Sequence, residues 1–357
     1  QKQINLFFKK QNMKKKSLSA KKKIHKSIIK YLNNKGFLKV FNEFKRSLNS
    51  KNKYAVAVSG GPDSLALAYL SKCFSIICNT KIYYYIVDHR LRRESFTEAK
   101  KVVSILRKFK INCKILVWKG KKPLSNIQSI ARKNRYSLLI KECKKNKIQH
   151  LLLGHHADDQ YENFLLRMLR GSGLKGLVSM DKLSKDNFYN IQFLRPLINI
   201  KKFKLKNISQ KVFNFFVEDP SNYNEDFKRI RIRHLIKKLE QEGLDKKKLE
   251  LTIKNLKDSD QTINFYVKNN IQKNAIFFIS NNTYILNKIF FNQPNEIIFR
   301  SLVYVMRKIS NRYYSARGKS ISDLISKIKF KKLKKVTLGG CIIEKINETV
   351  LISREIT

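Results

Sequence analysis

A loop near position 60 has the residue types that hold the phosphates of a nucleotide: Ser59, Gly60, Gly61, Pro62, Asp63 and Ser64. The two glycines let the backbone approach an anion, and the serine hydroxyls and the amides of a following helix can donate to phosphate oxygens. A carboxylate fits beside phosphates only if a cation lies between them, so Asp63 indicates Mg²⁺. A plain strand-to-helix turn is the alternative, but it requires neither the aspartate nor both serines.

A second group of polar residues follows the apolar run at 151–154. Asp159 and Glu162 are three residues apart, so on a helix they share one face and can hold a cationic substrate or a metal. A zinc site built from His155, His156, Asp158 and Asp159 is an alternative, but adjacent histidines rarely converge and the spacing is not H-E-x-x-H. A surface helix capped by Asp158 or Asp159 is the third interpretation.

Alternating strand and helix patterns must position these groups. Apolar runs predict strands at 54–58, 82–87, 113–118 and 151–154, and helical periodicity predicts helices at 64–72, 95–109 and 126–145. This order indicates a parallel sheet with helices on both faces, in which ligands bind beyond the carboxyl ends of the strands. The polar residues Asp88 and His89 follow the second strand, so we expect them in the same cleft.

The charge of the chain points to a polyanionic partner. It has 77 Lys and Arg against 26 Asp and Glu, a net charge of +51 over 357 residues. Solubility alone does not require such an excess, so nucleic acid is the leading candidate. A genome rich in A and T would explain the choice of lysine over arginine, but not the shortage of acids.

Cysteine usage and hydropathy indicate a cytoplasmic protein. The five cysteines have no metal-ligand spacing and form no C-x-x-C pair, so we expect reduced structural thiols at Cys73, Cys78, Cys113, Cys143 and Cys341. No apolar stretch approaches the roughly 18 residues that span a membrane, and the N-terminus has no signal-peptide core, so no membrane partner is expected. The oligomeric state stays open, with a homodimer as one option.

Composition and periodicity divide the chain into four segments: a basic flexible arm over 1–23, a nucleotide-binding catalytic domain with N-terminal helices over 24–225, a helical linker over 226–270 and a small basic α+β domain over 271–357. In the last segment we expect helices near 297–309 and 320–329 and a hairpin formed by 336–344 and 349–354. Because the chain begins at Gln1, Met13 or an upstream residue is expected to be the true start.

The loop at 59–64 lacks the lysine of the Walker pattern, which argues against a kinase or GTPase, and it resembles the PP-loop of the ATP pyrophosphatases. The ordered motifs are similar to those of the tRNA(Ile)-lysidine synthases over about 54–235: Ser59–Ser64; Val87-Asp88-His89 with Leu91-Arg92; Asn126, Gln128, Ala131, Arg132, Arg135 and Tyr136; Gly154–Gln160 with Glu162; Arg170–Leu177; Arg195-Pro196-Leu197; Asp219-Pro220-Ser221-Asn222; and Phe227, Arg229, Arg231 and Arg233. Arg90 stands where that family usually has glycine, and Asn163 where threonine is usual.

This resemblance implies a tRNA-modifying ligase with a Rossmann-like parallel-sheet PP-loop domain, a helical linker and a C-terminal tRNA-binding domain. ATP would adenylate the carbonyl oxygen at carbon 2 of the wobble cytidine in the CAU anticodon of an isoleucine tRNA. The ε-amine of free L-lysine would then displace AMP and form the carbon–nitrogen bond of lysidine, with pyrophosphate as the other product of ATP.

The resemblance also implies roles for individual residues. ATP would contact Ser59–Ser64, Asp88, His89 and Arg135, with Asp63 holding Mg²⁺ across the α and β phosphates. Lysine would contact Asp159, Glu162, Arg229 and Arg233, and the two carboxylates could accept the proton of its ammonium group. Catalysis would therefore depend on Asp63, Asp159, Glu162 and Arg135. For the arginines, and for Arg132, a solvated helix face is the alternative, and His89 could equally be structural.

The glycine-rich turn after the second polar group would contact the tRNA through Arg170, Gly171, Ser172, Gly173 and Lys175, with a flexible connector as the alternative.

Two other functions of the protein stay open. A PP-loop tRNA thiolase would use cysteines for persulfide or iron–sulfur chemistry, and the absence of C-x-x-C argues against it. A non-catalytic basic RNA-binding protein would not need Asp63, Asp159 and Glu162 together.

Overall fold

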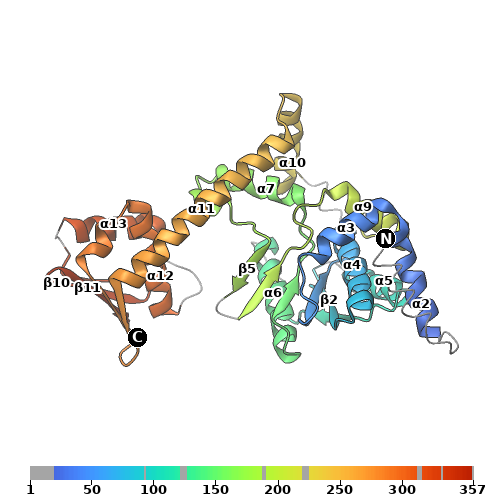
Figure 1. Cartoon of the computed structure of the whole chain (residues 1–357), viewed down its shortest axis with the longest axis horizontal. Coiled ribbons are helices and arrows are strands. Elements are labelled where there is room, and N and C mark those ends of the chain that lie inside the picture. Colours follow the sequence, from blue (N-terminus) through green and yellow to red (C-terminus); the bar gives the residue numbers. More distant parts are fainter. Residues whose placement is uncertain are drawn as a thin grey trace. The chain divides into compact units, whose positions relative to one another are not determined.

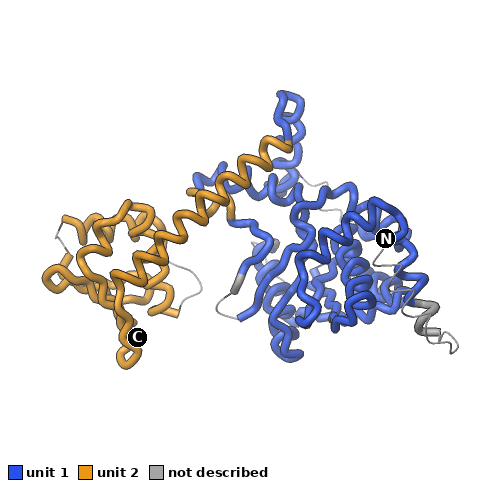
Figure 2. The backbone as a smooth tube through the Cα atoms, in the orientation of Figure 1, with its two compact units in different colours: residues 1–172, 179–245 blue, residues 173–178, 246–357 orange. Residues whose placement is uncertain are grey.

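The computed structural model describes residues 20–91, 94–120, 127–186, 190–218, 225–311, 316–330 and 333–355, with the backbone alone for 20–24, 128 and 185–186. The predicted arm over 1–23 lies almost wholly outside these residues, as do Arg92, Asn126 and the motif at 219–222. The chain forms two compact units, one of residues 1–172 and 179–245 and the other of residues 173–178 and 246–357 (Figure 2).

The first unit is built on a six-stranded sheet in the order β3-β2-β1-β4-β6-β5 (Figure 1). Its strands are β1 (Tyr54–Val58), β2 (Ile82–Asp88), β3 (Cys113–Val117), β4 (His150–Leu152), β5 (Leu183–Asp186) and β6 (Ile191–Leu194). All neighbouring strands run parallel except β5, which pairs antiparallel with β6 at the edge. The predicted α/β fold with a parallel sheet is confirmed, and the β5–β6 hairpin is an addition that the sequence did not indicate.

Helices cover both faces of this sheet, as the alternating pattern predicted (Figure 1). The helices of the unit are α2 (Ala20–Ile29), η1 (Lys30–Asn33), α3 (Lys35–Lys45), α4 (Pro62–Cys78), α5 (Ser95–Lys108), α6 (Ile127–Lys145), α7 (Ala157–Met168), α9 (Lys202–Phe213) and α10 (Lys228–Gln241), of which α10 packs against α7. Alternate residues of β1 enter two different cores. Tyr54 and Val56 pack with α3, α4, α5 and α9 on one face, while Ala55 packs with α6 on the other.

The second unit contains α8 (Leu174–Leu177), α11 (Lys246–Asn274), η3 (Lys288–Phe291), α12 (Asn295–Ser310) and α13 (Gly318–Lys329). Its antiparallel sheet has the order β7-β8-β11-β10-β9. The strands are β7 (Ala275–Phe278), β8 (Thr283–Leu286), β9 (Lys335–Leu338), β10 (Cys341–Ile346) and β11 (Thr349–Arg354). The two expected helices are present. The expected hairpin of 336–344 with 349–354 is present as β10 and β11, but a turn at Gly339 and Gly340 divides its first strand into β9 and β10. The β7–β8 hairpin is additional. The predicted linker over 226–270 comprises α10, in the first unit, and most of α11, in the second.

All five cysteines are free thiols. Burial raises the pKa of Cys73, Cys113 and Cys143 to about 12, so these side chains behave as small apolar groups. Among the residues that the structure describes, no helix is long and apolar enough to cross a membrane.

Candidate active site

The loop between β1 and α4 requires glycine at position 60 for two reasons. Gly60 has a φ of 87°, in the region that side chains disfavour, and a Cβ there would lie 2.9 Å from Cγ2 of Val102 and 3.0 Å from Cγ2 of Val217. The Val217 N–H also donates to the Gly60 carbonyl at 3.0 Å. The segment after α9 therefore packs directly on the loop and fixes its shape.

The serine hydroxyls of this loop bond to the loop itself. The Ser64 hydroxyl accepts from the Ser59 N–H at 3.0 Å and donates to the Gly61 carbonyl at 3.0 Å, while the Ser59 hydroxyl lies 3.1 Å from it. These bonds hold the start of α4, whose first position is Pro62. Because the first N–H groups of a helix lack partners within it, they are available for phosphate oxygens.

Close packing connects this loop to the second polar group. A Cβ on Gly154, at the end of β4, would lie only 3.3 Å from backbone atoms of Asp63 and Ser64. A larger residue at this position would require the two segments to move apart by a few tenths of an ångström. The carboxyl ends of β1 and β4 thus place the starts of α4 and α7 side by side, as expected for neighbouring parallel strands.

His156 lies among three carboxylates where these helices begin. Its side chain is buried, with Nε2 at 3.5 Å from Asp63 Oδ2 and 3.6 Å from Asp159 Oδ2, and Nδ1 at 3.7 Å from Asp158 Oδ2. Burial alone would lower the pKa of His156, but its hydrogen bond with Asp63 and the charges of Asp159, Asp63 and Asp158 outweigh burial and raise the pKa. The sequence singled out His156 only as a possible zinc ligand.

Asp159 stabilises the start of α7 as well as facing the site. Its Oδ2 accepts from the His156 N–H at 3.0 Å, so the alternative of a helix-capping aspartate describes part of its role. Burial would raise the pKa of Asp159, but the charge of His156 and the bond to the His156 N–H lower it. Asp159 is therefore a buried carboxylate held in its ionised form.

Glu162, one turn further along α7, is paired with an arginine of α10. Its buried Oε1 accepts from Nε of Arg233 at 2.6 Å, and its Oε2 lies 4.0 Å from Nε of Arg229. The structure thus brings together three of the four predicted lysine ligands and places Asp159 one turn away. It differs from the expectation of two free carboxylates, because Arg233 already neutralises Glu162. Arg231 instead donates to the carbonyls of Glu225 and Asp226.

A third set of polar residues follows the end of β2. The buried Asp88 accepts from the Arg90 N–H at 2.9 Å and from the Ser95 hydroxyl at 2.7 Å, and its Oδ2 has no partner among the described residues. Nε2 of His89 accepts from Nε of Arg135 at 3.3 Å. Burial and then the charge of Arg135 lower the pKa of His89 to about 4, so His89 is neutral.

The two departures from the resembled family have physical accounts. Arg90 has a φ of 51°, in the left-handed region that favours glycine, which explains why glycine is usual there. Asn163 donates from Nδ2 to the Ser179 hydroxyl at 3.3 Å. Neither departure removes a carboxylate from the site.

His155 points to a different partner from His156. Its Nδ1 accepts from Nε of Arg195 at 3.2 Å, and Arg195 is held by the Asp181 carbonyl and the Ser184 hydroxyl. Burial, then Arg195, Arg132 and Arg229, lowers the pKa of His155 to about 4 against the opposing charge of Asp159. The neutral ring therefore carries its proton on Nε2. Among the described residues, no group of three or more His, Cys, Asp or Glu side chains is arranged so that it could hold a metal ion by itself, and the two histidines do not form a zinc site.

The predicted tRNA-contacting turn is divided between the two units. Gly171 has a φ of 64° and ends α7, with the Gly171 and Ser172 N–H groups donating to the carbonyls of Met168 and Arg167. Open space surrounds Gly171 and Gly173. Lys175 lies in α8 of the second unit, where burial and then the charges of Arg300 and Arg307 lower its pKa.

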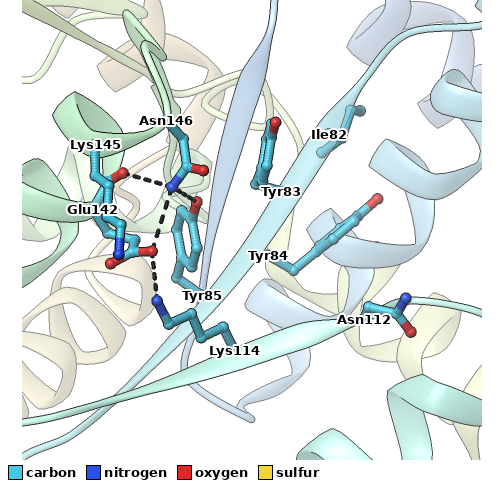
Figure 3. Close-up of a pocket in the computed structure, with 9 residues that line it drawn as sticks. All are labelled: Ile82, Tyr83, Tyr84, Tyr85, Asn112, Lys114, Glu142, Lys145 and Asn146. Atoms are coloured by element: carbon cyan, nitrogen blue, oxygen red, sulfur yellow. Dashed lines mark hydrogen bonds and ion pairs between the residues drawn. The ribbon is translucent and has the colours of Figure 1, made fainter.

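A pocket of about 430 Å³ lies at the opposite, amino ends of β2 and β3 (Figure 3). Its polar groups satisfy one another: Lys114 pairs with Glu142 at 2.6 Å, and Asn146 donates to the Tyr85 hydroxyl at 3.2 Å. None of the predicted site residues lines this pocket. The candidate active site is instead the polar cleft at the carboxyl ends of the strands.

Known proteins are similar to this chain in sequence. The PP-loop domain family matches residues 30–240. A tRNA(Ile)-lysidine synthase of Wolbachia sp. subsp. Brugia malayi is 37% identical over 311 residues, which cover 85% of this chain and 71% of that protein. The enzyme of the same name from Orientia tsutsugamushi is 33% identical, covering 85% of this chain and 70% of that protein.

Among solved structures, the U34-tRNA thiolase NcsA from Methanococcus maripaludis, with its [4Fe-4S] cluster, superposes with a TM-score of 0.52. It is 18% identical, and the match covers 62% of this chain and 78% of that chain. At this identity the likeness shows a shared fold alone.

Proposed function

The chain belongs to the tRNA(Ile)-lysidine synthase family, ATP-dependent ligase-type enzymes, and we propose that its polar cleft joins L-lysine to carbon 2 of the wobble cytidine in a CAU-anticodon isoleucine tRNA. The proposal rests on one observation: His156 lies between Asp63 of the PP-loop and Asp159 at the start of α7. The first can hold ATP and the second can hold a cationic amine.

The PP-loop side of the cleft fits Mg²⁺ together with ATP. Asp63 Oδ1 is buried and has no hydrogen-bond partner among the described residues, so a carboxylate oxygen is left for a cation beside the phosphate-binding amides. Bound there, Mg²⁺ would neutralise charge on the α and β phosphates. Gly60 and the bonded hydroxyls of Ser59 and Ser64 keep the loop open for the nucleotide.

The α7–α10 side suits the lysine substrate. Glu162 and Asp159 are buried carboxylates one turn apart, and Arg229 and Arg233 stand next to Glu162. The amine of lysine would be held by the carboxylates, and an arginine can bind the lysine carboxylate. Because Asp159 is kept ionised, it can accept the proton that the amine loses as it attacks.

The thiolase alternative is disfavoured by the cysteines themselves. Burial raises the pKa of Cys73, Cys113 and Cys143 to about 12, so none of these three is a thiolate near neutral pH. A persulfide mechanism needs an accessible thiolate.

The direct test supplies the protein with ATP, Mg²⁺, labelled lysine and total tRNA. We expect label in the CAU-anticodon isoleucine tRNA, together with AMP and pyrophosphate. Label that enters no tRNA, or sulfur transfer to tRNA in a parallel assay with a sulfur donor, would overturn the proposed function.

Glu162→Gln should raise the KM for lysine much more than the KM for ATP. A charge-assisted contact worth about 1.5–3 kcal/mol is lost to one substrate only, which corresponds to roughly 10- to 150-fold in the lysine requirement. Adenylated tRNA should still accumulate when lysine is omitted. Steady-state titrations in lysine and in ATP measure the two effects.

Glu142→Gln is the matched control, because Glu142 also forms an ion pair at 2.6 Å but at the distant pocket. It should leave both titrations unchanged. If ATP binding collapsed in Glu162→Gln while the lysine dependence stayed the same, Glu162 would belong to the nucleotide site.

Affinity for tRNA should fall steeply with salt. Each phosphate neutralised by lysine or arginine contributes about 0.7–0.9 to the slope of log K against log salt, so several contacts predict a slope of about −3 or steeper. Fluorescence anisotropy of labelled tRNA between 50 and about 300 mM KCl measures it. A flat plot would mean that the net charge of +51 is not used for RNA.

A further inference from the structure

Helix α11 exposes two adjacent aromatic side chains. Phe265 and Tyr266 are 60% and 56% exposed, and their rings meet edge to face with centroids 5.6 Å apart. The helix already buries Leu249, Ile253 and Val267. The aromatic pair is therefore not required for the packing of α11.

Helix formation does not explain why two aromatic residues are exposed at these positions. Phenylalanine and tyrosine are weaker helix formers than alanine, lysine or glutamate, so helix propensity does not favour them at these positions. Leu251 is also 56% exposed, but it lies four turns nearer the helix start and does not join the pair. Phe265 and Tyr266 alone form a short apolar strip on this helix.

Two exposed lysines lie on the same side of the helix as Phe265. Lys268 lies one turn after it, and Lys254 lies three turns, about 16 Å, before it. Asp258 is an acid between them. Aromatic rings bordered by lysines suit a ligand that has both flat rings and negative charges, which is the chemistry of unpaired nucleotides.

We propose that α11 is an RNA-stacking surface, on which unpaired bases of the tRNA stack against Phe265 and Tyr266 while Lys254 and Lys268 hold adjacent phosphates. The proposal rests on the proposed function for the identity of the RNA. This contact between α11 and the tRNA is separate from the glycine-rich turn at 170–175 and from the sheet of the second unit. A protein partner would use the same apolar strip but would show a different salt response.

Three variants of the full chain separate stacking from charge. Phe265→Ala with Tyr266→Ala removes the rings at exposed helical positions, where alanine favours the helix, so the fold is retained and circular dichroism verifies it. Lys254→Ala with Lys268→Ala removes two charges. Phe203→Ala is the matched control, because Phe203 is 65% exposed but lies on α9 in the first unit.

The measurement is the Kd for an unmodified CAU-anticodon tRNA transcript across a KCl series. Loss of one stacked base should weaken binding about tenfold or more at every salt concentration and leave the slope unchanged. Loss of two lysines should make the slope shallower by roughly 1.4–1.8. Phe203→Ala should bind like the wild type.

The proposal is overturned if the aromatic variant binds the transcript like the wild type, or if its loss of affinity disappears as salt is raised. It is also overturned if a blunt RNA duplex distinguishes wild type from variant as strongly as single-stranded poly(U) does, because stacking requires unpaired bases. Failure of the proposed function would appear separately, as wild-type protein that incorporates no labelled lysine at saturating tRNA.

Discussion

Asp63→Asn should abolish the formation of AMP and pyrophosphate while leaving tRNA affinity nearly unchanged. The substitution removes the one charged group that the PP-loop offers to a cation, and Asp63 Oδ1 is buried without a hydrogen-bond partner among the described residues. A metal that neutralises departing phosphates contributes several kcal/mol, so the rate of ATP cleavage should fall at least about a hundredfold. No basic contact to RNA is lost.

Two measurements on one protein preparation check this expectation. Pyrophosphate release with lysine, ATP and tRNA reports the chemistry, and anisotropy of labelled tRNA reports binding. Asp323→Asn, at an exposed position of α13, is the control and should match the wild type in both. Turnover of Asp63→Asn at the wild-type rate with Mg²⁺ would falsify the assignment of Asp63 as the metal ligand.

His156→Gln should be the most destabilising substitution in the cleft. The buried imidazole lies within 3.7 Å of the carboxylates of Asp63, Asp158 and Asp159. Without its charge, three carboxylates face one another with less compensation, and we expect a loss of about 2–3 kcal/mol in the free energy of unfolding. Activity should fall as well, because Asp63 and Asp159 would no longer be held in place.

The pH dependence of this loss has a definite sign. The folded-state pKa of His156 is raised above its ordinary value of 6.5, so its contribution is complete below 6.5 and is lost as pH rises through the folded-state pKa. The difference in stability between wild type and His156→Gln should therefore be larger at pH 6 than at pH 9. Urea unfolding at the two values measures it.

His234→Gln is the control for this experiment. His234 pairs with one carboxylate, Glu225, at 3.1 Å, but both side chains are at least half exposed. Such surface pairs contribute little, so the substitution should leave unfolding almost unchanged. A His156→Gln protein as stable as the wild type at both pH values would show that the three carboxylates need no cation.

The parts of the fold that the sequence predicted are those with strong local patterns. Strands such as Tyr54–Val58 are nearly all apolar because central parallel strands are buried on both faces, so they could be found without knowing their partners. The strand Leu183–Asp186 has a single apolar residue and forms only by pairing with β6, so periodicity could not reveal it. The β7–β8 turn did carry a signal, Asn281-Asn282, with Asn282 at a φ of 49°.

Within the site, residue spacing predicted which side chains gather but not how they pair. The helical spacing of Asp159 and Glu162 predicts a shared face of α7, and both side chains are buried on that helix. The choice of Arg233 as the partner of Glu162 depends on how α10 packs against α7, and the position of His156 depends on the distance between the starts of α4 and α7. These relations join segments far apart in the chain, and no local pattern encodes them.

The discontinuity of the second unit limits how its sequence can be exchanged between relatives. Residues 173–178, which form α8, belong with 246–357 and pack against α11, although the chain on both sides of them belongs to the first unit. If only residues 246–357 were exchanged between two relatives, α11 from one parent would pack against α8 from the other. A chimaera with a native interface between these two helices needs both stretches from the same parent.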